Sequence, residues 1–340
     1  MSGASSGIGT CYHMCPVQEM KWREANKLLH VFEVKHKNEK YPKVDPEKAV
    51  KQFSRSAAGK REDMPSDLRP SHVLLKTMNY LINKIIPITD VPWNVVYDFV
   101  NDRVQGIRQD ITIQRIEDLN TVQIFEKCIR FYITSAYILC EEASETFSQH
   151  LNRQQLQICL EKLLCLYKRF DSEYFFEFVA VFYAQSIDES ETFNRSLTVF
   201  SNILSNKIVY LCIRICLAFH SGNYMRFFKY VKELPVLLVM CFFHNFGSVR
   251  WHSLKAMSVA YSSKTCQIPL GVICHWLSIS KHEAVLNICK RYNIEINGKN
   301  VCFNKKDFNL NASILPMQKE DFIDSKLKNI KLSDLINGCS

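Results

Sequence analysis

The amino-acid sequence, 340 residues long, has no long uninterrupted apolar run. Its longest such run, Leu234–Phe243, is about half the length that a bilayer-spanning helix requires, and Glu233 and His244 bound it. We therefore predict no transmembrane segment. Apolar residues still make up 47% of the chain, which is ample for a continuous core spread over roughly two domains of ordinary size.

Paired metal-ligand motifs are also missing. Cys11, His13 and Cys15 alternate near the start, but no Cys-x-x-Cys or His-x-x-x-His pair accompanies them, so we predict no metal site. The 14 cysteines are distributed among apolar helical stretches, and no signal peptide is recognisable before them. They are expected to be small buried side chains in a reducing compartment rather than disulfide partners.

Catalytic constellations are absent as well. The segment Gly3–Gly9 resembles the glycine turn of short-chain dehydrogenases, and Tyr80 with Lys84 has the spacing of their Tyr-x-x-x-Lys pair. A phosphate-binding turn must leave a strand and enter a helix, whereas only Met1 and Ser2 precede Gly3 and no alternation of strands and helices follows. We favour a flexible arm over residues 1–16, and we predict no catalytic residue, no enzymatic activity and no cofactor.

Basic residues outnumber acidic residues only moderately. The chain has 43 Lys and Arg residues against 34 Asp and Glu residues, a formal net charge of +9. We interpret this as a modest excess spread along the chain rather than gathered in a tail. Such an excess permits a polyanionic partner without requiring one.

What the sequence does contain is helical periodicity. Apolar residues recur at intervals of three and four along successive stretches, which places them on one side of each predicted helix. These stretches are residues 70–86, 120–142, 154–170, 173–185, 190–204, 207–220 and 224–232. Because the connections are short and no helix can bury its apolar side alone, neighbours must stack in antiparallel pairs. We predict an all-α fold, a helical-repeat solenoid over residues 17–247.

A smaller pattern follows the predicted solenoid. Residues 248–261, 270–277 and a stretch from Ser280 onward are predicted helices, and strand-like runs flank Asn297–Gly298, where glycine allows the positive φ of a tight hairpin. Three helices and a β-hairpin predict a winged-helix module over residues 248–308. The remaining tail, residues 309–340, could form one amphipathic helix with Phe322, Leu327, Ile330 and Leu335.

Basic residues occur along this predicted winged helix. Winged helices place a helix and a wing against nucleic-acid backbones, where each Lys or Arg that meets a phosphate adds affinity. The candidate nucleic-acid ligands are Lys281, Lys290, Arg291, Lys299, Lys305 and Lys306. Ordinary solubility charge and a protein-docking face are the alternatives.

Charged residues are also scattered through the first part of the chain. They are either solvated helix faces or ion pairs that fix how helices cross, since arginine can bind a carboxylate through two nitrogens. The residues are Arg23, Arg55, Arg69, Asp98, Asp102, Arg103, Arg108, Asp110, Glu126 and Arg130.

Three ordered blocks of sequence resemble the GANP / suppressor-of-actin (SAC-domain) family of messenger-RNA export scaffolds. They are Gly9–Pro16 with Glu19, Arg23 and Val31–Val34; Val50–Gly59 with Pro65–Pro70; and Trp93 with Tyr97–Phe99, Asp102–Arg103, Gly106–Ile111 and Glu126–Phe131. The resemblance implies structural roles for the signature residues Cys15, Pro16, Glu19, Arg23, Arg55, Arg69, Asp98, Arg103, Arg108, Asp110, Glu126 and Arg130.

The same resemblance implies a non-catalytic platform, similar to PCI domains, that a winged helix caps. It implies pairing with a PCI-domain subunit and a small acidic DSS-type subunit in the nuclear transcription-and-export complex two, where paired winged helices contact RNA or DNA. The implied location is the nucleus or its envelope, with a cytoplasmic or centrosomal location as the alternative. In length the chain is similar to a short animal form of the family, which implies a different role, in centrosome duplication and mitotic spindle assembly.

Overall fold

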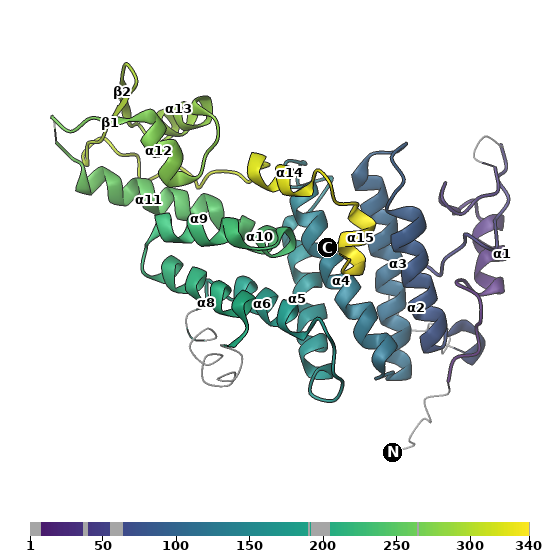
Figure 1. The fold of residues 1–340 in the computed structure, drawn as a ribbon. Coiled ribbons are helices and arrows are strands. Elements are labelled where there is room, and N and C mark those ends of the chain that lie inside the picture. The colour runs from purple at the N-terminus through teal and green to yellow at the C-terminus, as the bar shows by residue number, and fades with distance from the viewer. Residues whose placement is uncertain are drawn as a thin grey trace. The chain divides into compact units, whose positions relative to one another are not determined.

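The computed structural model describes residues 8–36, 40–54, 64–189, 191, 205–263 and 265–339. Helices dominate these residues and the sheet is small, which confirms the predicted all-α fold (Figure 1). The chain divides into two compact units. The first comprises Met1–Ser135, Glu142–Ser172 and Ile330–Ser340, and the second comprises Ala136–Glu141 and Glu173–Asn329. The finer division at residues 16, 247 and 308 stays a prediction.

The first unit contains long helices together with several short helices and turns. They are α1 (Val17–Ala25), the short turn η1 (Pro65–Asp67), α2 (Ser71–Tyr80) with the π turn η2 (Leu81–Ile85), α3 (Trp93–Gln114), most of α4 (Leu119–Ile138), α5 (Gln149–Leu166) and α15 (Leu332–Asn337). α5 begins where Ser148 accepts a hydrogen bond from the backbone N of Leu151. α3 ends at Arg115, which adopts a left-handed conformation.

The second unit begins with stacked helices, as the periodicity predicts. α6 (Phe175–Gln185) packs on α8 (Lys207–His220), α8 packs on α9 (Tyr224–Glu233), and α10 (Val236–Phe242) packs on both α6 and α9 before the short turn η4 (Phe243–Asn245). Asn206 and Asn223 cap α8 and α9, and Gly222 supplies the positive φ of the turn between them.

The longest apolar run of the sequence forms α10. Every residue of this helix is buried, so the run belongs to the core of the second unit. Among the described helices, none combines the length and the apolar character needed to cross a membrane.

The region predicted as a winged helix has the expected order of elements. α11 (Phe246–Ala260) is followed by β1 (Ile268–Pro269), α12 (Leu270–Leu277), α13 (His282–Arg291), β2 (Glu295–Asn297) and β3 (Asn300–Cys302). The strands form an antiparallel sheet in the order β1-β3-β2, with Val301 opposite both Ile268 and Ile296. Gly298 has a φ of +61° in the hairpin, as predicted, whereas the two-residue strand β1 was not predicted.

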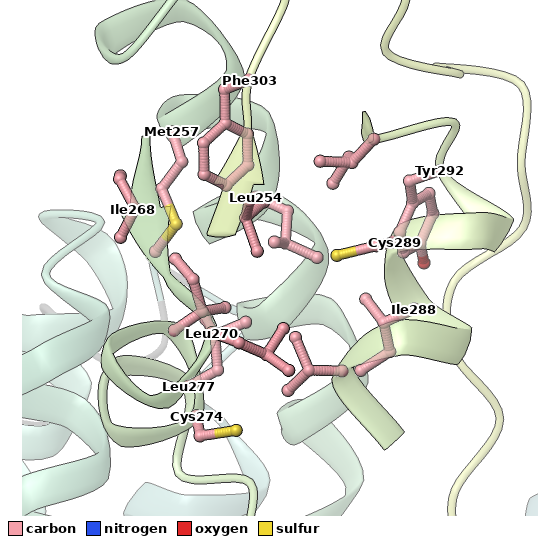
Figure 2. Close-up of a cluster of buried hydrophobic side chains, with 14 of the residues drawn as sticks. Leu254, Met257, Ile268, Leu270, Cys274, Leu277, Ile288, Cys289, Tyr292 and Phe303 are labelled. Atoms are coloured by element: carbon pink, nitrogen blue, oxygen red, sulfur yellow. The ribbon is translucent and has the colours of Figure 1, made fainter. Parts of the chain in front are cut away.

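One apolar cluster holds this module together (Figure 2). Leu254 and Met257 of α11, Leu277 of α12, Cys289 of α13 and Phe303 beyond β3 all lie within it. Tyr224 of α9 packs against the same cluster, so the module and the stacked helices share a boundary inside the second unit. Burial of these apolar side chains holds α13 and the hairpin in fixed positions within the module.

The two ends of the chain differ from the predictions. Residues 9–15 are not a free arm, because Cys11 and Cys15 are buried and backbone hydrogen bonds join Thr10 to Pro65 and Cys11 to Leu68. The tail forms two short helices rather than one. α14 (Asp321–Leu327) belongs to the second unit and α15 to the first. Most of the helix predicted for residues 190–204 lies outside the described residues.

Candidate functional site

Glu33 lies at the centre of a buried ion-pair cluster in the first unit. Its Oε2 accepts hydrogen bonds from Arg23 Nη1 of α1 (2.7 Å) and from Arg103 Nη2 of α3 (3.0 Å), and its Oε1 accepts one from the backbone N of Val50 (3.0 Å). Burial raises the pKa of Glu33, but the charges of Arg103 and Arg23 outweigh that effect, so its pKa lies below the ordinary value. One carboxylate thus ties α1 and a loop segment to α3.

Cys15 extends this cluster. Arg23 Nη2 donates hydrogen bonds to Cys15 Sγ (3.2 Å) and to the carbonyl oxygen of Val50 (3.0 Å). Burial raises the pKa of the Cys15 thiol to about 12, so the thiol stays protonated near neutral pH and is not a nucleophile.

Asp110 of α3 is the centre of a second buried cluster. Its Oδ2 accepts a hydrogen bond from Arg69 Nε (2.7 Å), and its Oδ1 accepts one from Lys51 Nζ (2.7 Å). Arg69 Nη1 also donates to the carbonyl oxygen of Met14 (3.2 Å). The carboxylate therefore joins the Lys51 and Arg69 segments to α3 directly, and Arg69 adds the Met14 segment.

Gln114, one turn further along α3, fixes the start of the described chain. Its Nε2 donates to the carbonyl oxygen of Arg69 (2.9 Å), and its Oε1 accepts from the backbone N of Gly9 (2.8 Å). A Cβ added at Gly9 would lie 2.3 Å from the carbonyl oxygen of Leu68, so only glycine fits there.

A third cluster anchors α15. Glu126 and Arg130 of α4 are both buried, and Glu126 Oε1 accepts hydrogen bonds from Tyr167 (2.9 Å) and Ser172 (2.6 Å). Gly338, which ends α15 with a φ of +87°, lies against Arg130, because a Cβ there would come within 2.9 Å of the guanidinium atoms.

Six of the scattered charged residues are buried, which favours a structural role inside the fold over a solvated helix face. They are Arg23, Arg69, Arg103, Asp110, Glu126 and Arg130. Other signature residues lie elsewhere. Glu19 pairs with Arg23 one turn away (3.3 Å), and Pro16 immediately precedes α1. Arg108 donates to Gln155 of α5 (2.6 Å), Asp98 is exposed on α3, and Arg55 lies outside the described residues.

The predicted nucleic-acid ligands are not equally available. Lys290, Lys299, Lys305 and Lys306 are exposed, and none forms an ion pair within the part of the chain that the structure describes. Lys281 lies 3.9 Å from Asp321. Arg291 donates from Nε to the carbonyl oxygen of Ser313 (3.1 Å) and from Nη2 to the Ser313 hydroxyl, so its guanidinium is already engaged.

The structure adds an ion pair that the sequence reasoning missed. Arg250 of α11 binds Glu320 through two hydrogen bonds, Nη1 to Oε1 (2.5 Å) and Nη2 to Oε2 (3.0 Å), and it also donates to the carbonyl oxygens of Leu277 and Ser278. The two residues are far apart in sequence, so no local pattern could have paired them.

The distribution of charge was also misjudged. Residues 207–308, from the start of α8 to the end of the predicted winged helix, carry 14 Lys and Arg residues and only four Asp and Glu residues. The rest of the chain carries 29 basic and 30 acidic residues. The whole positive excess therefore lies in this one stretch, and the prediction that it is spread along the chain was wrong.

Two open depressions occur near these sites. One, of about 520 Å³, lies beside α13 and is lined by Arg250, Asn287, Arg291 and Glu320 among others; the other, of about 310 Å³, is lined by residues near Tyr12 and Pro16. In the described ranges, no group of His, Cys, Asp and Glu side chains is arranged to hold a metal ion. All 14 cysteines are free thiols and most are buried, as predicted.

Comparison with known proteins gives a family match over most of the chain. The model of the SAC3/GANP family matches residues 14–298, which include the residues around Glu33, Asp110 and Glu126 and all of α13, but neither Gly9 nor α15. The chain belongs to the SAC3/GANP family. This confirms the resemblance carried by the three signature blocks.

Individual SAC3/GANP relatives are longer than this chain. SAC3 family protein 1 of Schizosaccharomyces pombe is 30% identical over 97% of this chain and 35% of its own length. Protein xmas of Drosophila melanogaster is 27% identical over 87% of the chain and 15% of its own length. SAC3 family protein B of Arabidopsis thaliana is 24% identical over 81% and 17%. The chain thus spans about a third or less of these relatives.

Proposed function

We propose that this SAC3/GANP chain is a non-catalytic scaffold that supports messenger-RNA export and contacts nucleic acid through its winged helix. The observation that carries the proposal is the concentration on that module of exposed cations that pair with no carboxylate among the described residues, at Lys290, Lys299, Lys305 and Lys306. Each of these that meets a phosphate releases counterions and adds affinity without sequence preference.

The charged groups of the first unit support a scaffold rather than an enzyme. Glu33 and Asp110 each accept hydrogen bonds from two cationic side chains, and Cys15 is buried with a raised pKa. Groups held in this way fix the backbone, whereas a general base or a nucleophile needs an accessible, activated atom.

The proposed partners are a PCI-domain subunit and a small acidic DSS-type subunit, and the proposed location is the nucleus. Family membership and the stacked-helix fold that leads into a winged helix support this part of the proposal. The centrosomal alternative stays a prediction, because no feature of the described residues favours it over export.

The test is affinity purification of the tagged full chain from nuclear extract, with mass spectrometry and ultraviolet crosslinking to polyadenylated RNA. We expect both proposed subunits and a crosslinked RNA adduct. Recovery of neither a PCI-domain subunit nor RNA would remove the proposal.

A further inference from the structure

A second basic surface lies outside the winged helix, on α8 and α9. These helices run side by side in the second unit (Figure 1). We define the α8–α9 surface by Lys207, Tyr210 and Arg214 of α8 and Arg226, Lys229 and Tyr230 of α9. Spacings of three and four residues place each trio on one side of its helix. The opposite sides are buried and include Cys212, Cys216, Phe227 and Val231.

Arginine and tyrosine side chains stack on this surface. The guanidinium carbon of Arg214 lies 4.3 Å from the ring centroid of Tyr230 and 5.7 Å from that of Tyr210, and Nη2 donates to the Tyr230 hydroxyl. Tyr210 is 48% exposed, so a large part of its ring faces solvent. Within the described residues, Arg214 forms no ion pair with a carboxylate.

The charge here is unlike that of an ordinary solvated face. α8 and α9 together contain five Lys and Arg residues and one acidic residue, Glu233. A solubility surface normally mixes both signs. An exposed face that combines cations of one sign with accessible aromatic rings is instead the composition of single-strand nucleic-acid sites, in which bases stack on rings and guanidinium planes.

The surface is also joined to the winged helix by direct packing. α9 contacts both α11 and α12, and Tyr224 at its start packs into the apolar cluster of the module. Both basic surfaces therefore belong to the same compact unit, within the stretch that carries the whole positive excess.

We propose that the α8–α9 surface binds single-stranded nucleic acid. Tyr210, Arg214 and Tyr230 stack on unpaired bases, while Lys207, Arg226 and Lys229 neutralise phosphates. Paired bases in a duplex do not present their faces, so the stacking contribution is specific to single strands. The inference rests on the proposed nucleic-acid contact of the winged helix and adds a second, separable site to it.

The test measures fluorescence anisotropy of a labelled single-stranded oligouridine and of a duplex RNA with the full chain and its co-purifying subunits. The double variant Tyr210→Ala/Arg214→Ala should weaken single-strand binding about tenfold or more and duplex binding much less, because each stacked base contributes substantially. Tyr210→Phe keeps the ring and should retain affinity. Both substituted residues, Tyr210 and Arg214, are at the surface, and matching thermal melts will show that the variants fold.

A matched control exists in the first unit. Tyr41 is 60% exposed and lies under two cations, Lys27 Nζ at 5.2 Å and Lys40 Nζ at 5.7 Å. The variant Lys27→Ala/Tyr41→Ala removes the same kinds of group from the first unit, outside the basic stretch 207–308, and it should leave both affinities unchanged.

Three outcomes separate the inference from the proposed function. If the unmodified chain binds no RNA, both fall. If Lys290→Glu/Lys299→Glu weakens binding but Tyr210→Ala/Arg214→Ala behaves like the control, the inference is overturned and the proposed function stands. If Tyr210→Ala/Arg214→Ala loses a protein subunit while RNA affinity is kept, the surface is a protein interface and the inference is overturned as well.

Discussion

The two units use charge in opposite ways. In the first unit, Arg23, Arg69 and Arg103 are buried and their guanidinium groups are bound by Glu33 or Asp110. In the stretch 207–308 of the second unit, most cations are exposed and lack carboxylate partners among the described residues. Buried pairs are costly to break and therefore hold segments in place, whereas exposed cations stabilise little and remain available to a partner. Similar residue types thus serve structure in one unit and, under the proposed function, recognition in the other.

The strongest test of this difference between the two units is to remove one buried carboxylate from the first unit. Asp110→Asn leaves the Arg69 and Lys51 charges buried without a counter-charge, and we expect the free energy of unfolding to fall by about 3–5 kcal/mol. Urea denaturation followed by circular dichroism measures this. Asp98→Asn on the exposed side of α3 is the control, with an expected change within about 0.5 kcal/mol. Equal effects of the two substitutions would refute the structural role of Asp110.

A pH series tests the Glu33 cluster. Because the pKa of Glu33 in the folded protein lies below its ordinary value of 4.5, its pairs stabilise the fold above that value, and the stabilisation is lost as pH falls through the folded pKa. Glu33→Gln should lower stability at neutral pH and reduce the further loss seen below about pH 4.5. Denaturant midpoints between pH 7 and pH 3 measure both effects. An unchanged acid dependence would contradict the assignment.

Charge reversal tests whether the exposed cations of the second unit bind RNA. Lys290→Glu/Lys299→Glu should weaken RNA binding about tenfold or more and reduce the salt slope by about 2, since two phosphate contacts are lost. Anisotropy titrations at several salt concentrations measure this. Lys76→Glu/Lys168→Glu changes the net charge equally in the first unit and should have little effect on RNA binding.

Arg291→Ala should weaken RNA binding less than Lys290→Ala in the same titrations, because Ser313 already engages the Arg291 guanidinium.

The smallest expected effect concerns α15. Gly338→Ala adds a Cβ against the Arg130 guanidinium and imposes a positive φ on alanine, whereas Gly222→Ala imposes the positive φ in open space. We expect Gly338→Ala to cost about 1 kcal/mol more than Gly222→Ala. Denaturation of both variants measures the difference. A cost no greater at Gly338 would mean that α15 is held loosely.

Local features were predictable from the sequence because they depend on neighbouring residues. The stacked helices follow from three- and four-residue apolar spacing, and Gly298 identifies the hairpin. α3 was not among the predicted helices, because Asp102, Arg103 and Asp110 interrupt its apolar pattern with charges that find partners only in the fold. β1 is two residues long and gives no periodic signal.

Long-range pairings could not be predicted. The sequence identified Arg23, Arg69 and Asp110 as candidates, but not which carboxylate each arginine would meet. Arg250 was missed because its partner Glu320 lies in a tail that looks polar and irregular. The packed start was missed for the same reason: Gly9 is held by Gln114, more than 100 residues away. Simple counting of charges by segment would have found the basic stretch.

The membership of α15 in the first unit has a consequence for how the protein matures. Asn337 accepts a hydrogen bond from Lys127 Nζ (2.5 Å) and donates one to Asn83 (2.8 Å), so residues near position 337 complete a unit that begins hundreds of positions earlier. During synthesis, that unit stays unfinished until its last segment leaves the ribosome. The intervening helices can assemble first, and the first unit closes only once α15 has emerged.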